Sequence, residues 1–188
     1  MLHIKPITKE IKHDKERFDQ IKQLYQSAFP KQEQASLAFI INQTKKNTVR
    51  FDAFYDEDVF VGFTYTISFG DMTYLWYLAV SSELRSKGYG SQMMRQLRDI
   101  FPNDRIVLNL DVQDEFASDS EIRKKRQEFY IKNGYVLAEY SCTFNKNHLD
   151  VMSNGGSVTA NEFLSIFKPY FGPVIYFFAG PKIRMNNR

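Results

Sequence analysis

Residues 77–91 read YLAVSSELRSKGYGS, and this stretch decides the fold of the chain. Its apolar start predicts a strand, its polar middle a loop, and the residues that follow predict a helix with one apolar face. In the loop, Arg85, Gly88 and Gly90 are spaced as R-x-x-G-x-G. Glycines let a backbone turn tightly beside an anion, and the helix start presents unpaired N–H groups and a positive dipole end. The stretch therefore predicts a pyrophosphate cradle, to which Arg85 and Lys87 add positive charge.

Other phosphate-binding loops fit this stretch less well. The chain has no G-x-x-x-x-G-K-[ST] sequence, which excludes a P-loop by its motif. A dinucleotide fingerprint needs a third glycine three residues after Gly90, where this chain has Met93. On the glycines alone, a turn that merely begins a helix is an equally good interpretation.

The composition indicates one globular domain over residues 1–188. Hydrophobic residues make up 43% of the chain, which is enough apolar material for a core. A net charge of +3 does not require a nucleic-acid partner, and the single cysteine, Cys142, excludes an internal disulfide. Residues 1–20 lack the apolar core of a signal peptide, and the apolar run at 174–179 is too short to span a bilayer. We therefore expect a cytoplasmic protein with no membrane partner, and the isolated histidines indicate no metal site.

The apolar pattern predicts strands and helices along the whole chain. Strands are expected at 2–7, 48–55, 59–69, 74–80, 105–112 and 135–144, and helices at 9–27, 32–44, 90–101 and 118–133. Turns at 56–58 and 70–71 join three strands into an antiparallel meander, and two later strand–helix units imply a parallel pair. Beyond residue 144 we expect a helix at 159–170 and a last strand at 173–178. The expected fold class is α/β (α+β), a mixed and mostly antiparallel sheet whose parallel strands splay into a ligand slot.

A second segment, at 125–135, indicates a function only when it is considered together with the stretch at 77–91. Residues 125–135 read KRQEFYIKNGY, which alone predicts an amphipathic helix with two core aromatics. The two segments, about 40 residues apart, together resemble the Gcn5-related N-acetyltransferase (GNAT) family. The loop of that family reads R/Q-x-x-G-x-G/A, and its later helix commonly reads F-Y-x-x-x-G-F. Phe129, Tyr130 and Gly134 match the helix pattern, with Tyr135 in place of the last Phe, and the resemblance covers about residues 1–144.

The resemblance implies a sheet with helices on both faces and acetyl-CoA as the cosubstrate. It places the pyrophosphate on the loop residues Arg85, Ser86, Lys87, Gly88, Tyr89, Gly90 and Ser91. It places the pantetheine arm along the preceding strand, near Leu78 and Val80. Many members carry an asparagine just before the later helix. This chain departs from that pattern with FASDS at 116–120, so Ser118 or Ser120 could substitute.

The resemblance also suggests residues for the chemistry. Tyr130 stands where the family often has the phenol that protonates the departing thiolate. Glu33 follows Phe29-Pro30 in a stretch that borders the acceptor side in the family, and is the first candidate to bind or deprotonate the amine. A carboxylate that only interacts with a helix dipole is the competing interpretation of Glu33, and Asp111 and Asp114 are rival carboxylates.

The expected reaction is direct transfer of acetyl to an amine, carried by a small molecule, a peptide or a protein. One alternative is an acyl-CoA-binding module without catalysis, which would act as a sensor or bind a partner. Another is a nucleic-acid-binding protein, which the small net charge and the lack of an aromatic RNA-binding signature disfavour.

Overall fold

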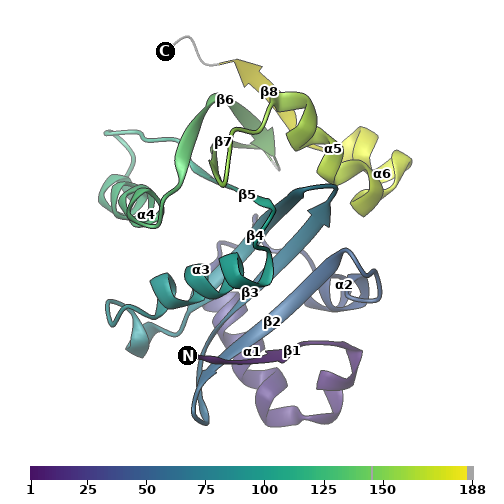
Figure 1. The fold of residues 1–188 in the computed structure, drawn as a ribbon, viewed down its shortest axis with the longest axis vertical. Helices are drawn as coiled ribbons and strands as arrows, with labels where there is room; N and C mark the ends of the chain where they lie inside the picture. Colours follow the sequence, from purple (N-terminus) through teal and green to yellow (C-terminus); the bar gives the residue numbers. More distant parts are fainter. Residues whose placement is uncertain (145, 186–188) are drawn as a thin grey trace. The chain divides into compact units, whose positions relative to one another are not determined.

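The computed structural model describes residues 1–144 and 146–185, and these form two compact units (Figure 1). The first unit comprises Met1–Ser68 and Leu75–Pro102, and the second comprises Phe69–Tyr74 and the chain from Asn103 onward. The sheet has the strand order β1-β2-β3-β4-β5-β7-β6-β8. Strand β4 (Met72–Val80) contributes residues to both units.

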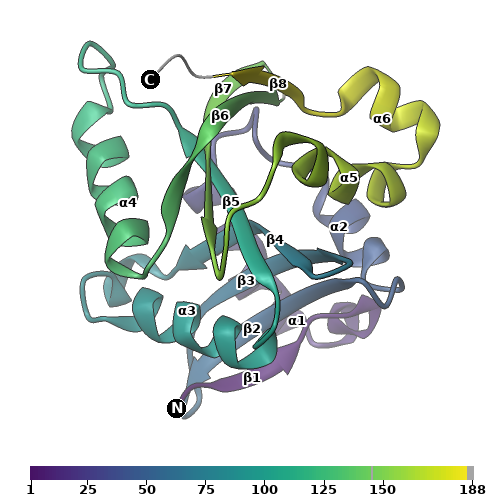
Figure 2. The ribbon, with the colours of Figure 1, turned by 45° about the horizontal axis from the view of Figure 1, so that its top comes forward.

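The first unit contains four antiparallel strands and the helices that cover them. In chain order its elements are β1 (His3–Pro6), η1 (Lys9–His13), α1 (Lys15–Ala28), α2 (Leu37–Gln43), β2 (Val49–Asp56), β3 (Val59–Phe69), β4, η2 (Ser82–Leu84) and α3 (Tyr89–Ile100). Helices α1 and α2 lie on one side of the strands and α3 on the other (Figure 2). The predicted meander is confirmed. Its turns contain Glu57 and Gly70, which both have a positive φ.

Two helices of this unit differ from the sequence-based expectation. The helix expected at 9–27 is interrupted at Asp14, whose side chain accepts a hydrogen bond from the N–H of Arg17 and so caps α1 (3.2 Å). The helix expected from residue 32 begins only at Leu37, because Phe29–Ser36 form a loop that is held in place through its backbone. In that loop the N–H of Glu33 donates to the carbonyl of Pro30 over 2.9 Å, a local turn that replaces the helix.

The second unit contains the rest of the sheet. Its elements are β5 (Arg105–Asp111), α4 (Ser120–Lys132), β6 (Val136–Phe144), β7 (Asn147–Asn154), α5 (Ala160–Phe171), α6 (Pro173–Ala179) and β8 (Lys182–Met185), together with the start of β4. The predicted parallel pair is confirmed, because Met72–Tyr74 pair in parallel with Arg105–Val107. The fold is therefore a mixed, mostly antiparallel sheet with one parallel pair.

The C-terminal part of this unit corrects the sequence analysis. Strand β7 was not expected, because NHLDVMSN has weak strand propensity; pairing with β5 on one side and β6 on the other stabilises it. The strand expected at 173–178 is wrong. Pro173 occupies the first turn of a helix, where its fixed φ favours helix formation, and strand β8 follows instead. The helix expected at 159–170 is confirmed as α5, which Thr159 and Glu162 begin with a reciprocal capping box.

Candidate functional site

The loop between β4 and α3 has the backbone conformation that its glycine predicts. Strand β4 ends at Val80, and the one-turn helix η2 leads to Arg85 in an extended conformation. Two left-handed residues follow, Ser86 with φ of 62° and Gly88 with φ of 84°. A Cβ atom at Gly88 would meet nothing within 4 Å, so the glycine is there for its backbone angle and not for lack of space inside the chain. The loop therefore reverses direction just before α3 begins.

The start of α3 is open to an anion. Gly88 is the N-cap, and no side chain caps the helix. The N–H groups of the first helical turn, from Tyr89 to Ser91, have no carbonyl four residues earlier within the helix. Lys87 and Arg85 are exposed beside this turn, and Arg85 donates one hydrogen bond, from Nε to the carbonyl of Val80 (3.2 Å). The loop thus combines unpaired backbone donors, a positive dipole end and two cations, which is the chemistry that a pyrophosphate requires.

The first residue of α3 anchors the loop to the unit. The hydroxyl of Tyr89 donates to a carboxylate oxygen of Asp56 over 2.6 Å, and the Asp56 carboxylate raises the pKa of the Tyr89 phenol. The ring of Tyr89 packs with Leu78 and Val80 against a core of Leu2, Phe54, Val61 and Met93. The side chains of Leu78 and Val80 are therefore used for packing, so only their backbone groups are left to contact a ligand.

One edge of β4 is paired only at the start of the strand. Its parallel ladder with β5 covers Met72, Thr73 and Tyr74 and stops there. Among the described residues, no strand pairs with the second edge of Leu75–Val80. A strand edge without a ladder exposes N–H and C=O groups in a row. Leu78 and Val80 lie on this edge, where an extended amide-containing chain could pair with them, and the Val80 carbonyl already accepts one hydrogen bond from Arg85.

Tyr130 lies in the second unit, near the end of α4. Its half-buried ring makes edge contacts with Phe129 and Tyr135, at centroid distances of 5.1 and 5.8 Å. Its hydroxyl makes no hydrogen bond to any of the described residues, whereas the hydroxyls of Tyr74, Tyr77 and Tyr89 are all bonded. Desolvation raises the pKa of the Tyr130 phenol above its ordinary 10, so the group keeps its proton at neutral pH. Tyr130 is thus a protonated phenol whose hydroxyl donates to none of the described residues.

Glu33 lies in a turn and not at the start of a helix. Helix α2 begins four residues later, at Leu37, so the competing interpretation as a helix-dipole residue is wrong. The loop that carries Glu33 is fixed by two tyrosines. The hydroxyl of Tyr77 donates to the Glu33 carbonyl (2.8 Å), and the hydroxyl of Tyr25 donates to the carbonyl of Ala35 (2.9 Å). These hydrogen bonds therefore hold the backbone at Glu33 in place.

The two rival carboxylates already have partners, and the cysteine is buried. Asp111 makes an ion pair with Arg126 at 3.4 Å, and Asp114 accepts a hydrogen bond from the N–H of Phe116. Cys142 is fully buried, and desolvation raises the pKa of its thiol to about 11. The thiol therefore stays protonated at neutral pH and is a poor nucleophile.

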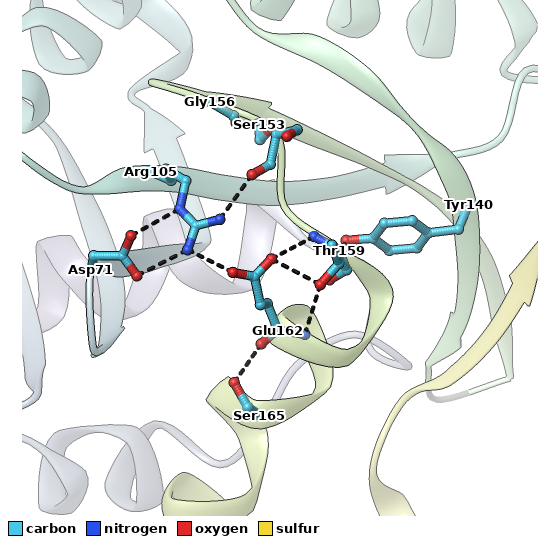
Figure 3. Close-up of polar contacts among 9 residues, drawn as sticks. Asp71, Arg105, Tyr140, Ser153, Gly156, Thr159, Glu162 and Ser165 are labelled. Atoms are coloured by element: carbon cyan, nitrogen blue, oxygen red, sulfur yellow. Dashed lines mark hydrogen bonds and ion pairs between the residues drawn. The ribbon is translucent and has the colours of Figure 1, made fainter.

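A polar cluster in the second unit was not expected from the sequence (Figure 3). Arg105 donates two hydrogen bonds to Asp71, at 3.1 and 2.9 Å, and one to Glu162 at 2.9 Å. Hydrogen bonds from Arg105 and then from Thr159 lower the pKa of Glu162 to about 2. The T-x-x-E spacing at 159–162 could have revealed the capping box, but nothing in the sequence indicates the arginine partner.

Two further properties concern metals and membranes. Within residues 1–144 and 146–185, no group of three or more His, Cys, Asp and Glu side chains could hold a metal ion. No helix in that part of the chain is both long and apolar enough to cross a lipid bilayer.

Comparison with known families identifies the family of the chain. The family model "Acetyltransferase (GNAT) family" matches residues 18–135, so the chain belongs to the GNAT family of acetyltransferases. This range contains both the loop at 85–91 and the helix that carries Tyr130. No curated protein matches the sequence significantly.

Solved structures share the fold at low sequence identity. A GNAT-family protein from Bacteroides thetaiotaomicron has a TM-score of 0.72 and 20% identity, over 96% of this chain and 99% of its own. An aminoglycoside 6'-N-acetyltransferase complexed with coenzyme A has a TM-score of 0.63 and 20% identity, over 81% and 96%. A ribosomal-protein alanine N-acetyltransferase from Escherichia coli has a TM-score of 0.59 and 15% identity, over 86% and 98%. At these identities the likeness supports the fold and does not identify the acceptor.

Proposed function

We propose that the chain is an N-acetyltransferase that moves acetyl from acetyl-CoA directly to an amine. The observation that carries the proposal is the uncapped start of α3, behind a left-handed Gly88 and beside Arg85 and Lys87. Backbone N–H groups from Lys87 to Ser91 bind the pyrophosphate, and Arg85 adds charge. The unpaired edge at Leu78 and Val80 hydrogen-bonds the pantetheine arm. A cytoplasmic location belongs to the same proposal.

The chemical roles follow from the family pattern and from the state of each group. The cosubstrate supplies a thioester whose sulfur leaves as a thiolate. Tyr130 holds its proton at neutral pH and donates it to that sulfur. Glu33 binds the ammonium of the acceptor or removes its proton. Transfer within a ternary complex needs no acyl-enzyme, and the buried, protonated Cys142 is unsuited to form one.

The acceptor is an amine of a small molecule, a peptide or a protein. The similar structures include an aminoglycoside 6'-N-acetyltransferase and a ribosomal-protein alanine N-acetyltransferase, so both kinds of acceptor occur on this fold. A panel of polyamines, aminoglycosides, amino acids and peptides, screened for acetyl-CoA-dependent release of free thiol, identifies the class. If acetyl-CoA binds and no amine releases thiol, the chain is an acyl-CoA-binding module and the proposal fails.

Substitution of Gly88 tests the proposed binding site. Acetyl-CoA at a hundred times its Kd should stabilise the native chain by about 2.7 kcal/mol, seen as a rise in melting temperature. Gly88→Val forces a side chain into the space beside the first turn of α3, and the rise should disappear. The matched control is Gly70→Val, because Gly70 also has a positive φ and open space around its Cβ, so the backbone strain is similar. Equal thermal shifts in the two variants would place the cosubstrate elsewhere.

A further inference from the structure

Helix α6 exposes large apolar side chains to an unusual extent. Val174 is 70% exposed, Ile175 48%, Phe177 79% and Phe178 81%. Scattered exposed apolar residues are ordinary, but a contiguous group that includes two phenylalanines indicates a contact surface. We name these four residues the α6 face. Figures 1 and 2 show α6 on the far side of α5 from strands β5 and β7, at the margin of the second unit.

The α6 face is one side of an amphipathic turn. At about 100° per residue, its four residues fall within an arc of about 160°, and Tyr176 lies outside that arc. Tyr176 is half-buried and takes the ammonium group of Lys168, on α5, over its ring at 5.8 Å. Tyr176 therefore holds α6 to α5, and this contact turns the α6 face outward.

The charged side chains of the segment that carries the α6 face have one sign. Glu162 is the last acidic residue of the sequence. Every charged side chain that follows it in the segment of α5, α6 and β8 is therefore basic. Lys168, Lys182 and Arg184 are all exposed in this segment. The whole chain has a net charge of only +3, so this accumulation of positive charge is local.

We propose that the α6 face docks on an anionic lipid bilayer surface. Phenylalanines and aliphatic residues that enter the boundary between headgroups and acyl chains, next to lysine and arginine, are the two features of interfacial membrane binding. The sequence led us to expect no membrane partner, because the run at 174–179 is too short to span a bilayer. The α6 face does not need to span the bilayer, because it lies along its surface.

A second copy of the chain is a poorer occupant. In a symmetric dimer the same patch meets itself, so the basic residues of both copies would be brought together without compensation. A standard interface also buries about 800 Å² on each partner, whereas four side chains of one short helix offer about 500 Å². A surface of anionic headgroups satisfies both the charge and the small area.

Vesicle sedimentation tests the proposal with the full chain. We expect the protein to sediment with phosphatidylcholine vesicles in which about a third of the lipid is phosphatidylglycerol, and to remain in solution with phosphatidylcholine alone. Phe177→Ser combined with Phe178→Ser should lower the binding constant at least about tenfold, because the apolar contribution is lost. The matched control is Phe116→Ser, since Phe116 is 97% exposed but lies before α4, and it should bind as wild type does.

A second pair of variants separates local charge from net charge. Lys182→Gln combined with Arg184→Gln should weaken vesicle binding by about tenfold or more, since each basic side chain near the surface contributes roughly 1 kcal/mol. Lys124→Gln combined with Lys125→Gln removes the same net charge from exposed positions on α4 and should change binding little. Thermal unfolding of each variant shows whether it is folded.

Three outcomes would overturn the proposal. The first is equal binding to neutral and anionic vesicles, or none to either. The second is a folded Phe177/Phe178 variant that binds as well as the Phe116 variant. The third is a wild-type dimer that binds no vesicles and dissociates in the Phe177/Phe178 variant, which would assign the α6 face to a second copy. None of these measurements depends on acetyl transfer.

Discussion

Arg85 follows the short helix η2 after β4, and Arg105 is the first residue of β5. The surroundings of the two side chains differ completely. Arg105 donates to Asp71, Glu162 and the carbonyl of Ser157, and its side chain is 18% exposed. Arg85 is exposed and, among the described residues, donates only to the carbonyl of Val80. Arg85, which has few partners, lies in the R-x-x-G-x-G motif. Arg105, which has many partners, lies in no motif.

The difference teaches how a binding group and a structural group can be distinguished here. The guanidinium of Arg105 is satisfied by the chain itself, which raises its pKa through Glu162 and Asp71 and ties the start of α5 to the β3–β4 turn. Arg85, the first turn of α3 and the hydroxyl of Tyr130 keep donors that none of the described residues uses. Unused donors at ordered positions are what a ligand requires.

The sharpest test of this distinction is at Tyr130. Tyr130→Phe removes a hydroxyl that has no partner among the described residues, so stability should change little. If the hydroxyl is the general acid, turnover should fall by about 10²-fold or more. Acetyl-CoA affinity, measured by thermal shift, should stay near wild type. Wild-type turnover under conditions where chemistry limits the rate would remove Tyr130 from the mechanism.

The two arginines should respond in opposite ways to the same substitution. Arg85→Gln should weaken acetyl-CoA binding about tenfold, the effect of losing one charge-assisted contact, without lowering the melting temperature of the free protein. Arg105→Gln should lower that melting temperature by several degrees, because Asp71 and Glu162 lose their shared cation, and should leave affinity unchanged. Calorimetry on both variants checks the pair. A stability loss in the Arg85 variant alone would reverse our assignment.

Substitution of Glu33, the proposed acceptor-binding residue, should have a smaller effect on activity than substitution of Tyr130. Glu33→Gln keeps the shape of the side chain and the hydrogen bond from Tyr77 to the backbone carbonyl, so the turn should persist. Acceptor efficiency should fall several-fold. If Glu33 is the base, the loss lies in kcat and shrinks as pH rises, because more amine arrives neutral; if it anchors the ammonium, the loss lies in KM. Full efficiency with the true acceptor would turn attention to Asp111 and Asp114.

The smallest expected effect is the acid response of the Arg105 cluster. Glu162 has its pKa lowered from 4.5 to about 2, so its ionised form stabilises the fold above about pH 4.5, and this contribution disappears as pH falls toward 2. Melting temperatures of wild type and Glu162→Gln should therefore differ at neutral pH and converge between about pH 4.5 and 2. Glu128→Gln, which removes an exposed carboxyl on α4, is the control for the loss of one negative charge. A difference that persists unchanged at pH 2 would mean that packing, and not charge, explains the effect.

Much of the fold was predictable because local chemistry determines it. The meander, the parallel pair, α3 and α5 follow from apolar periodicity, turn residues and capping signals, and the loop follows from the backbone angle at Gly88. What could not be predicted depends on distant partners. Strand β7 forms because two neighbours pair with it, and Arg105 meets Glu162 across 57 residues. The run VIYFF suits a strand or a helix equally, and only Pro173 distinguishes them.

The missing cap of α3 has a consequence for the abundance of the protein. Helix α5 begins with its own capping box, but α3 begins at a glycine with no side-chain cap, so its first turn lacks a contribution of roughly a few tenths of a kcal/mol. Under the proposed function the pyrophosphate supplies that contribution, and the folded population then depends on ligand supply. On that proposal, a chain without acetyl-CoA would open more often and would be a better protease substrate. If acetyl-CoA binds as proposed, the cellular half-life of the protein would lengthen as the acetyl-CoA level rises.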